Sequence, residues 1–224
     1  MTFEINQRCD TIPSELLVKY SKISTATMGH RVDGNAMDSG IRMFVGGPII
    51  AGPALTVRTL GRDSTVCHKV FDLAMPGDIL VVDRGGDQHY ACWGEMMSLA
   101  AKNCGIAGVI VDGLVTDIEA LRAIGVPVYA RGLSPITTLL LGEGGSINTP
   151  VGCGGLRVLP GTLVIADEDG ILVLDSVLAT DSLNSFEAEA EEDEIYRTKL
   201  LDGKLPSQLS PIDALIKGSV NDRS

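Results

Sequence analysis

A helix start that follows a glycine-rich loop is the first feature of this sequence suited to chemistry. The stretch 83–97, DRGGDQHYACWGEMM, places a strand end, a flexible loop and a helix N-terminus in series. Amide groups in the first turn of a helix have no acceptor within the helix. The amides of Gly94, Glu95, Met96 and Met97 are therefore able to bind a carboxylate.

Two acidic residues are expected beside that helix start. Glu95 lies in its first turn, and the strand 107–113 ends in a loop that carries Thr116 and Asp117 to the same sheet edge. Ligands of open α/β sheets bind at the carboxyl ends of the strands. Each of these residues can also be explained by a structural role alone. Glu95 in a first turn stabilises the helix by roughly 0.3–1 kcal/mol, and Thr116 or Asp117 can cap the next helix. Taken singly, each residue fits the structural interpretation, but their convergence favours a functional site.

Several common chemistries are excluded by the residue patterns. The sequence contains neither a G-x-S-x-G elbow nor a GxxxxGK[ST] phosphate loop, and it shows no Cys/His metal spacing. The histidines His30, His68 and His89 are scattered along the chain. A Schiff-base lysine needs an apolar pocket, and neither Lys69 nor Lys102 lies in an apolar run.

Composition and charge narrow the class of protein. The 224 residues include 18 basic and 29 acidic groups, a net charge of −11, and they form no basic run for nucleic acid. The start of the chain lacks a signal sequence, and no apolar run approaches the roughly 20 residues of a membrane span. We expect a soluble, cytoplasmic protein. Its cysteines are odd in number and are expected to be reduced thiols: Cys9, Cys67, Cys92, Cys104 and Cys153.

The elements that position these residues alternate in type. Strands are predicted at 79–83, 107–113 and 126–131, and helices at 93–105 and 117–125. This rhythm predicts an α/β fold with a largely parallel central sheet covered by helices. Short strands separated by PG and DG turns follow in 154–175 and indicate antiparallel pairing, so the sheet is mixed.

The last fifth of the chain has a different character. A long helix is predicted from about Leu178 to Leu201, with an acidic run at 187–194 that is typical of a solvated face. We see no linker and no repeat. The prediction is a single domain over residues 1–224, with a core at about 24–175 and a C-terminal acidic helix and tail at 176–224.

The spacing of the acidic residues resembles a known signature. Gly94-Glu95, the twenty residues 96–115 and then Thr116-Asp117 are similar to the G-x-E/D-x20-R-D type signature of the RraA-like family. That family includes the regulator of ribonuclease activity A and class II 4-hydroxy-4-methyl-2-oxoglutarate aldolases. The resemblance extends over roughly Ser24 to Leu174, through segments such as GPALTVR, PGDILVVD and GIAGVIVDGLVTD.

The resemblance implies a swivelling α/β domain, a homotrimer with active sites between subunits, and a divalent cation, Mg²⁺ or Mn²⁺. Asp117 matches the direct metal ligand. Glu95 matches the acid that holds metal-bound water and takes part in proton transfer. The amides of the segment Gly94–Met97 match the part that binds the pyruvyl carboxylate. An acid from a neighbour's C-terminal helix is implied to complete the site.

One position departs from the family pattern. Thr116 stands where the aldolases have an arginine that binds the substrate's carboxylate and ketone oxygen, and a hydroxyl does not replace a bidentate cation. Arg84, at the mouth of the glycine loop, is a candidate substitute for that arginine. A surface loop arginine is the alternative interpretation.

The resulting expectation is a metal-dependent lyase of the class II pyruvate aldolase type. It would cleave a small 4-hydroxy-2-oxo acid to pyruvate and a carbonyl product through an enolate, with oxaloacetate decarboxylation as a side activity. Two alternatives stay open: a non-catalytic interaction protein that docks a basic partner on its acidic surface, and a related enzyme whose substrate is not a pyruvyl compound.

Overall fold

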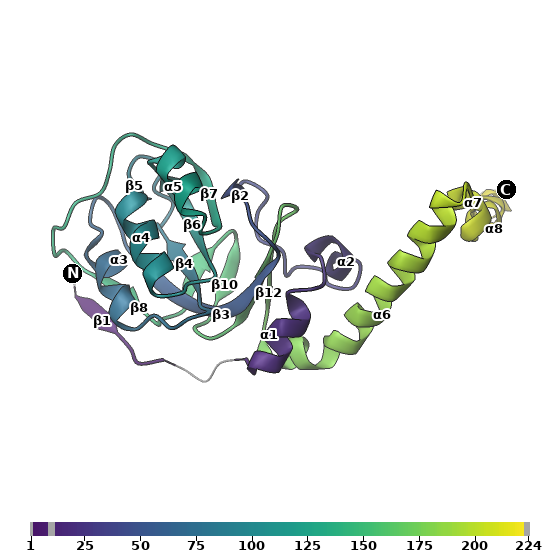
Figure 1. Ribbon diagram of the computed structural model, residues 1–224, viewed down its shortest axis with the longest axis horizontal. Coiled ribbons are helices and arrows are strands. Elements are labelled where there is room, and N and C mark those ends of the chain that lie inside the picture. The colour runs from purple at the N-terminus through teal and green to yellow at the C-terminus, as the bar shows by residue number, and fades with distance from the viewer. Residues whose placement is uncertain (1, 9–11, 222–224) are drawn as a thin grey trace. The chain divides into compact units, whose positions relative to one another are not determined.

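The computed structural model describes residues 2–8 and 12–221 (Figure 1). By internal contacts the chain divides into two compact units, residues 1–183 and 184–224. The predicted single domain over residues 1–224 stays a prediction. Cys9 lies outside the described residues.

The first unit is built on a ten-stranded mixed sheet and a separate two-stranded one. The strands of the large sheet are β1 (Phe3–Ile5), β2 (Arg42–Val45), β3 (Ile50–Arg58), β4 (Ile79–Asp83), β5 (Ala91–Trp93), β6 (Gly108–Val115), β7 (Val128–Leu133), β8 (Gly145–Ile147), β11 (Leu163–Ala166) and β12 (Ile171–Leu174). The small sheet pairs β9 (Val151–Cys153) with β10 (Leu156–Val158) in antiparallel fashion.

The helices of the first unit are short. They are α1 (Ser14–Tyr20), α2 (Thr25–Gly29), α3 (Thr65–Lys69) with a 3-10 turn at Val70–Asp72, α4 (Glu95–Asn103) and α5 (Ile118–Ile124). Helix α6 (Ser176–Leu201) begins in the first unit and continues into the second, which also contains α7 (Pro206–Leu209) and α8 (Ile212–Asn221).

The alternation predicted from the sequence produces the parallel part of the sheet. Strands β3, β4, β6 and β7 pair in parallel, in that order. Strand β2 adds to β7 in antiparallel fashion, and β11 and β12 form the antiparallel region expected from the PG and DG turns. The predicted α/β class with a mixed sheet is confirmed, and the long acidic helix is present as α6.

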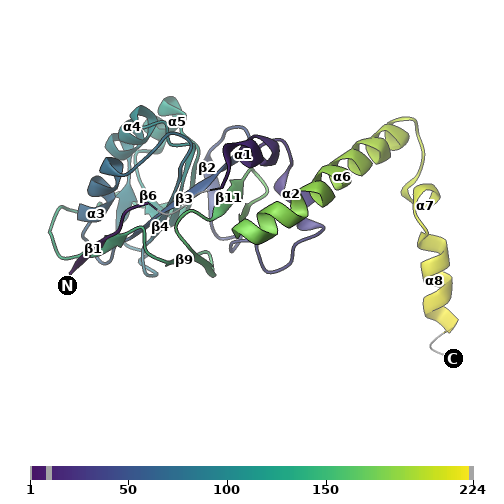
Figure 2. The same ribbon diagram turned by 90° about the horizontal axis from the view of Figure 1, so that it is seen from below.

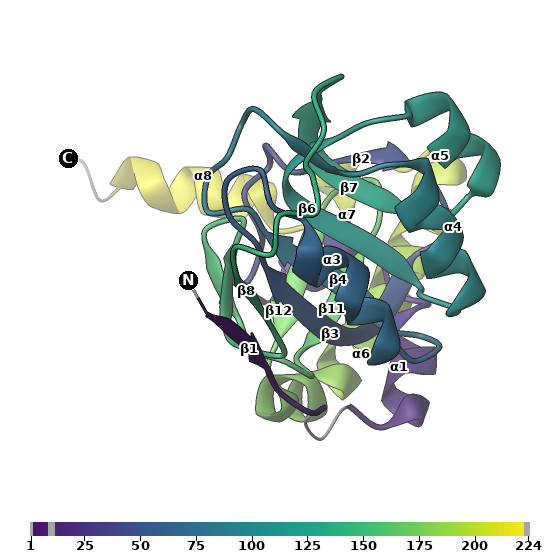
Figure 3. The ribbon, with the colours of Figure 1, turned by 90° about the vertical axis from the view of Figure 1, so that its left-hand side faces the viewer.

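Alternate residues of the buried strands supply two separate apolar cores, because successive side chains of a strand point to opposite faces. On β4, Leu80 and Val82 pack with residues of α3, α4 and α5, whereas Ile79 and Val81 pack with residues of β9 to β12. Figure 3 looks onto the face that α3 and α4 cover. The first core therefore fixes the helices that carry the candidate site.

Strand β3 joins the parallel and antiparallel parts of the sheet. Its second half, Ala54–Arg58, pairs with β4, and its first half, Ile50–Pro53, pairs with β11. Figure 2 shows β3 running between these two groups of strands. Within the described ranges, no helix combines the length and apolar character that crossing a membrane requires.

Candidate functional site

The starts of α4 and α5 meet at the carboxyl ends of β5 and β6, and Gly94 makes this close approach possible. Gly94 is the N-cap residue of α4 and has an extended backbone. A Cβ atom on Gly94 would lie 2.4 Å from Oδ2 of Asp117 and 2.8 Å from Cγ2 of Thr116. Only glycine leaves room for both side chains. The glycine that precedes Glu95 is therefore a steric requirement for the approach of Thr116 and Asp117 to α4.

Asp117 adopts a backbone conformation that aspartate enters at a cost. Its φ is +55°, and among the described non-glycine residues only Asn148 shares a positive φ. Such a conformation costs on the order of 1–3 kcal/mol and is concentrated at functional sites. The surrounding structure therefore holds Asp117 in a strained position.

The carboxylate of Asp117 is directed to α4 rather than to its own helix. Asp117 precedes α5, yet in the described structure its side chain makes no capping bond there. Instead Oδ2 accepts a hydrogen bond from the amide of Glu95 at 3.0 Å. Asp117 is therefore the N-cap residue of α5 by position, as the structural interpretation expects, but its carboxylate bonds to α4.

A cavity of about 160 Å³ opens at this point. It is lined by Ser64, His68, Ala91, Cys92, Trp93, Gly94, Glu95, Met96, Met97, Thr116, Asp117, Thr137 and Thr138. The amides of Met96 and Met97 lie in the first helical turn, where an intrahelical acceptor is absent by geometry. The structure thus brings together Gly94, Glu95, Met96, Met97, Thr116 and Asp117, as the sequence predicts.

Trp93 hydrogen-bonds to both α4 and the segment after β6. Its indole Nε1 donates to Oγ of Ser98 at 2.8 Å, inside the core. Its carbonyl accepts a bond from the amide of Thr116 at 2.8 Å. Glu95 is half-buried beside it. Trp93 is itself buried, so its bonds hold the starts of α4 and α5 in fixed positions.

The position of Arg84 corrects the expectation for that residue. Arg84 is 1% exposed, so the interpretation as a surface loop arginine is wrong. Its Nη2 donates to the carbonyl of Gly61 at 2.6 Å and to Asp87 at 3.1 Å, and Arg84 is not among the described residues that line the cavity. The arginine is drawn inward because a buried guanidinium needs an anion and carbonyl acceptors, which Asp87 and Gly61 supply.

Some cavity residues were missed by sequence reasoning. His68, on α3, has an exposed side chain that lines the cavity, and Thr137 and Thr138 reach it from the loop after β7. In the sequence His68 is one of three scattered histidines, and no local pattern connects it to Asp117. Only the packing of α3 over the sheet brings the two segments together.

The loop that carries Thr137 and Thr138 is anchored by Asp63. The carboxylate of Asp63 accepts hydrogen bonds from the amides of Leu141 at 3.1 Å, Glu143 at 2.7 Å and Gly144 at 3.4 Å. It also accepts from the amide and hydroxyl of Thr65. Burial alone would raise the pKa of Asp63, but the hydrogen bonds from Thr65, Leu141 and Glu143 outweigh it and hold the pKa well below its ordinary value.

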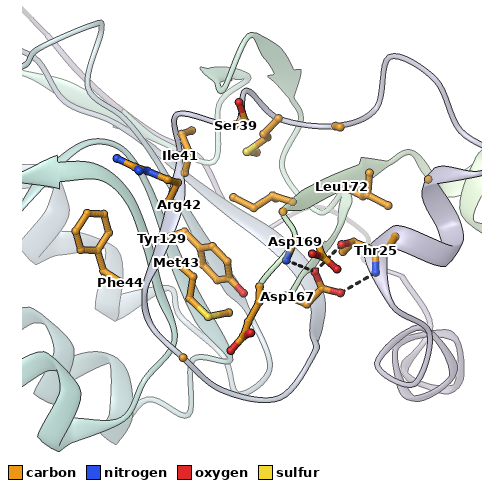
Figure 4. A pocket seen from close by; sticks show the side chains of 18 residues that line it. Thr25, Ser39, Ile41, Arg42, Met43, Phe44, Tyr129, Asp167, Asp169 and Leu172 are labelled. Atoms are coloured by element: carbon orange, nitrogen blue, oxygen red, sulfur yellow. Dashed lines mark hydrogen bonds between the residues drawn. The ribbon is translucent and has the colours of Figure 1, made fainter.

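A larger cavity, of about 730 Å³, lies between the loop after α2 and the β11–β12 turn (Figure 4). Its most buried acid, Asp167, is occupied by the protein itself. The carboxylate accepts from the amide and hydroxyl of Thr25 at 2.7 and 2.5 Å and from the amide of Asp169 at 3.0 Å. The smaller cavity is the better candidate site, because it combines amides of a first helical turn with an exposed carboxylate on a strained backbone.

Comparison with known proteins identifies the family of the chain. The family description "RraA-like: Aldolase/RraA" matches residues 13–173. A protein of Halalkalibacterium halodurans named putative 4-hydroxy-4-methyl-2-oxoglutarate aldolase is 31% identical over 189 residues, 84% of this chain and 90% of the relative. A Thermus thermophilus protein named 4-hydroxy-4-methyl-2-oxoglutarate aldolase is 34% identical over 142 residues, 63% of this chain and 85% of the relative.

Solved structures give the same assignment. Streptomyces coelicolor RraAS2, described as an unusual member of the RNase ES inhibitor RraA protein family, superposes with a TM-score of 0.75 at 28% identity. The match covers 84% of this chain and 99% of that one. The RNA-processing inhibitor RraA from Thermus has a TM-score of 0.61 at 33% identity, over 67% of this chain and 90% of that one. The chain belongs to the RraA-like family.

Proposed function

We propose that this protein is a divalent-metal-dependent lyase that cleaves a small 4-hydroxy-2-oxo acid to pyruvate and a carbonyl product. The observation that carries the proposal is Asp117, a strained carboxylate held against the start of α4 within the cavity. The names of the curated relatives support the reaction class. Decarboxylation of oxaloacetate is a natural side activity, because it passes through the same pyruvate enolate.

The donor atoms around Asp117 fit Mg²⁺ or Mn²⁺. Among the described residues, Oδ2 of Asp117 accepts one amide bond and Oδ1 has only a 3.4 Å contact from the hydroxyl of Thr116, so oxygen lone pairs remain available. Glu95 adds a second carboxylate in the same cavity. These are the hard oxygen donors that such cations prefer, with water in the remaining positions. Asp117 is the proposed direct ligand.

The remaining groups of the site have distinct proposed roles. The amides of Met96 and Met97 bind the substrate's carboxylate at the positive end of α4. Glu95 removes the proton from the C4 hydroxyl, directly or through water, so that C4 becomes a carbonyl as the C3–C4 bond breaks. When bound, a divalent cation supplies the positive charge that stabilises the enolate left on C3.

Thr116 leaves this cavity without the arginine that the aldolase signature has at that position. The carboxylates of Glu95 and Asp117 line the cavity, and His68 is the basic residue among its described lining residues. Because Arg84 is engaged elsewhere, it does not substitute for an arginine at position 116. We expect Thr116→Arg to raise kcat/KM for 4-hydroxy-4-methyl-2-oxoglutarate. A matched Thr116→Lys variant supplies charge without the bidentate fork and should raise it less.

A homotrimer with sites between subunits is part of the same proposal. The segment Leu133–Leu141 exposes several large apolar side chains next to Thr137 and Thr138. An exposed apolar patch of this kind is typical of an interaction surface. A second copy that covers the segment would also border the cavity. Light scattering should then give a mass near three times 23.6 kDa or a multiple of it, and a clean monomer at micromolar concentration would contradict the trimer.

The direct test is a screen of 4-hydroxy-2-oxo acids and oxaloacetate for pyruvate release by the full chain. We expect turnover with Mg²⁺ or Mn²⁺ and its loss on addition of EDTA. Turnover that EDTA leaves unchanged would contradict the metal-dependent mechanism. Absence of turnover with every substrate, together with binding of a basic protein partner, would favour the non-catalytic alternative.

A further inference from the structure

The larger cavity contains a buried hydroxyl that lacks a partner. Tyr129, on β7, is 1% exposed and belongs to the lining of the cavity of about 730 Å³. Its Oη has no hydrogen-bond partner among the described residues. Figure 4 shows the ring of Tyr129 beside Met43, with the hydroxyl on the side where Asp167 lies. An unpaired polar group in the interior is costly, so a ligand that supplies the missing partner is favoured there.

This cavity is separate from the candidate site. Tyr129 lies near the start of β7, where it pairs with Met43 of β2 and Ile110 of β6. Thr116, which lines the smaller cavity, directly follows the last residue of β6. Among the described residues, none lines both cavities. The two cavities therefore lie at opposite ends of the parallel strands.

The wall of the larger cavity is negatively charged at the turn between β11 and β12. This turn contributes Asp167, Glu168 and Asp169 to the lining. Asp167 is already bonded to Thr25 and to the amide of Asp169. Glu168 and Asp169 are exposed, and neither carboxylate has an ion-pair partner within the described part of the chain. Burial and the charges of Asp167 and Glu168 raise the pKa of Tyr129, so its hydroxyl stays uncharged.

The rest of the cavity wall is largely apolar. Arg42 is the basic residue among the described residues of the lining, and it is exposed. Figure 4 shows its guanidinium turned away from Asp167 and Asp169. A volume of this size lies within the range of roughly 300–1,000 Å³ that small-molecule sites occupy. The aliphatic side chains of the lining include Met37, Ile41, Met43 and Leu172.

We propose that the larger cavity binds a primary alkylammonium ion, a small amine carried on an aliphatic chain. The ammonium group donates hydrogen bonds to the Oη of Tyr129, which has free lone pairs, and to the carboxylate of Glu168. The chain packs against the aliphatic wall. A neutral alcohol of the same length lacks the charge pairing, and a carboxylate is repelled by the acids of the turn.

Isothermal titration calorimetry of the full chain with n-hexylamine tests the proposal near pH 7, where a primary amine is protonated. 1-Hexanol and hexanoate carry the same chain with a neutral or a negative head. We expect n-hexylamine to bind at least roughly tenfold more tightly than 1-hexanol, and hexanoate to bind more weakly than both. Equal or tighter binding of 1-hexanol or hexanoate would overturn the proposal.

Two variants test the groups that hold the ammonium. Tyr129→Phe removes the hydroxyl alone and should weaken n-hexylamine binding about fivefold to tenfold. It should not lower the denaturant midpoint, because the hydroxyl has no partner among the described residues. Glu168→Gln should weaken binding about tenfold. Full affinity in both variants would overturn the proposal.

Two controls separate this site from other acids of the chain. Glu15→Gln removes an exposed acid outside the cavity and should leave the affinity for n-hexylamine unchanged. Asp117→Asn removes an acid of the smaller cavity and should leave it unchanged as well. Weakening by either control as large as that by Glu168→Gln would overturn the proposal. Binding is measured without substrate or metal, so its outcome is independent of the proposed lyase activity.

Discussion

Two aspartates of the first unit, Asp63 and Asp117, each stand just before a short helix, and they are used in opposite ways. Asp63 is 1% exposed and accepts bonds from Thr65 and from the amides of Leu141, Glu143 and Gly144. Asp117 is exposed, has a left-handed backbone, and accepts one amide bond, from Glu95, and a long contact from Thr116.

The difference shows how a structural carboxylate is distinguished from one available to a ligand. The donors around Asp63 saturate its oxygen atoms. Its carboxylate therefore holds the surrounding loops together and has little capacity left to bind a ligand. Asp117 has a strained backbone, and among the described residues its carboxylate accepts only the amide of Glu95 and the long contact from Thr116. A residue of this kind is expected where a ligand supplies the missing partner.

The largest expected effect is on stability, at Asp63. Asp63→Ala removes the acceptor of several buried or half-buried donors and should lower the free energy of unfolding by roughly 3–5 kcal/mol. Denaturant unfolding of the purified variant measures this change. Asp117→Asn is the control and should change the free energy of unfolding by less than about 1 kcal/mol, since the Asp117 carboxylate has few partners and asparagine accepts the left-handed backbone. Equal losses of unfolding free energy in the two variants would contradict the distinction between a structural carboxylate and one available to a ligand.

The next effect is on turnover, at Glu95. Glu95→Gln keeps the shape of the side chain and removes its basicity, so we expect kcat to fall about a hundredfold, with a smaller change in KM. Steady-state kinetics on the best substrate of the screen gives both values. A rise in KM alone would indicate that Glu95 binds substrate and takes no part in proton transfer.

A smaller effect is expected from Gly94→Ala. The added Cβ would collide with Oδ2 of Asp117 and Cγ2 of Thr116, and Asp117 would have to leave the amide of Glu95. We expect kcat/KM to fall about tenfold, because catalytic groups tolerate little displacement. Gly29→Ala is the control: its Cβ would meet nothing within 4 Å, and Gly29 borders the larger cavity. A fall of similar size in the control would contradict the choice of cavity.

The smallest effect is an acid dependence of stability at Asp63. Its folded-state pKa lies below the ordinary value, so its contribution is present above a pH of about 4 and is lost as the pH falls further. At pH 3 the loss should be about 1 kcal/mol. Asp63→Asn lacks this group, and the stability gap between it and the wild type should narrow by that amount between pH 5 and pH 3.

The parallel part of the fold was predictable because its signals are local. Apolar runs such as Ile79–Asp83 are bounded by turns, and the helix that begins at Glu95 follows a glycine, so the sheet edge shared by Glu95 and Asp117 could be inferred. The left-handed backbone of Asp117 could not be inferred from the sequence, because aspartate also adopts ordinary backbone conformations. Its bond to α4 in place of α5 depends on how the two helices pack.

Features that depend on contacts between distant segments could not be read from the sequence. Arg84 follows a strand and precedes two glycines, a pattern that fits a surface loop, yet Asp87 and the carbonyl of Gly61 hold it inside the protein. His68 likewise reaches the cavity through contacts between segments that are distant in the sequence.

The central claim is that Asp117 is kept strained and unsaturated in order to bind a divalent cation. Asp117→Asn tests it most directly, because asparagine accepts the left-handed backbone and keeps the size of the side chain while losing the charge. We predict that the variant unfolds at the wild-type denaturant midpoint or slightly above it and loses metal-dependent turnover. An Asp117→Asn protein that keeps full, EDTA-sensitive turnover would contradict the account.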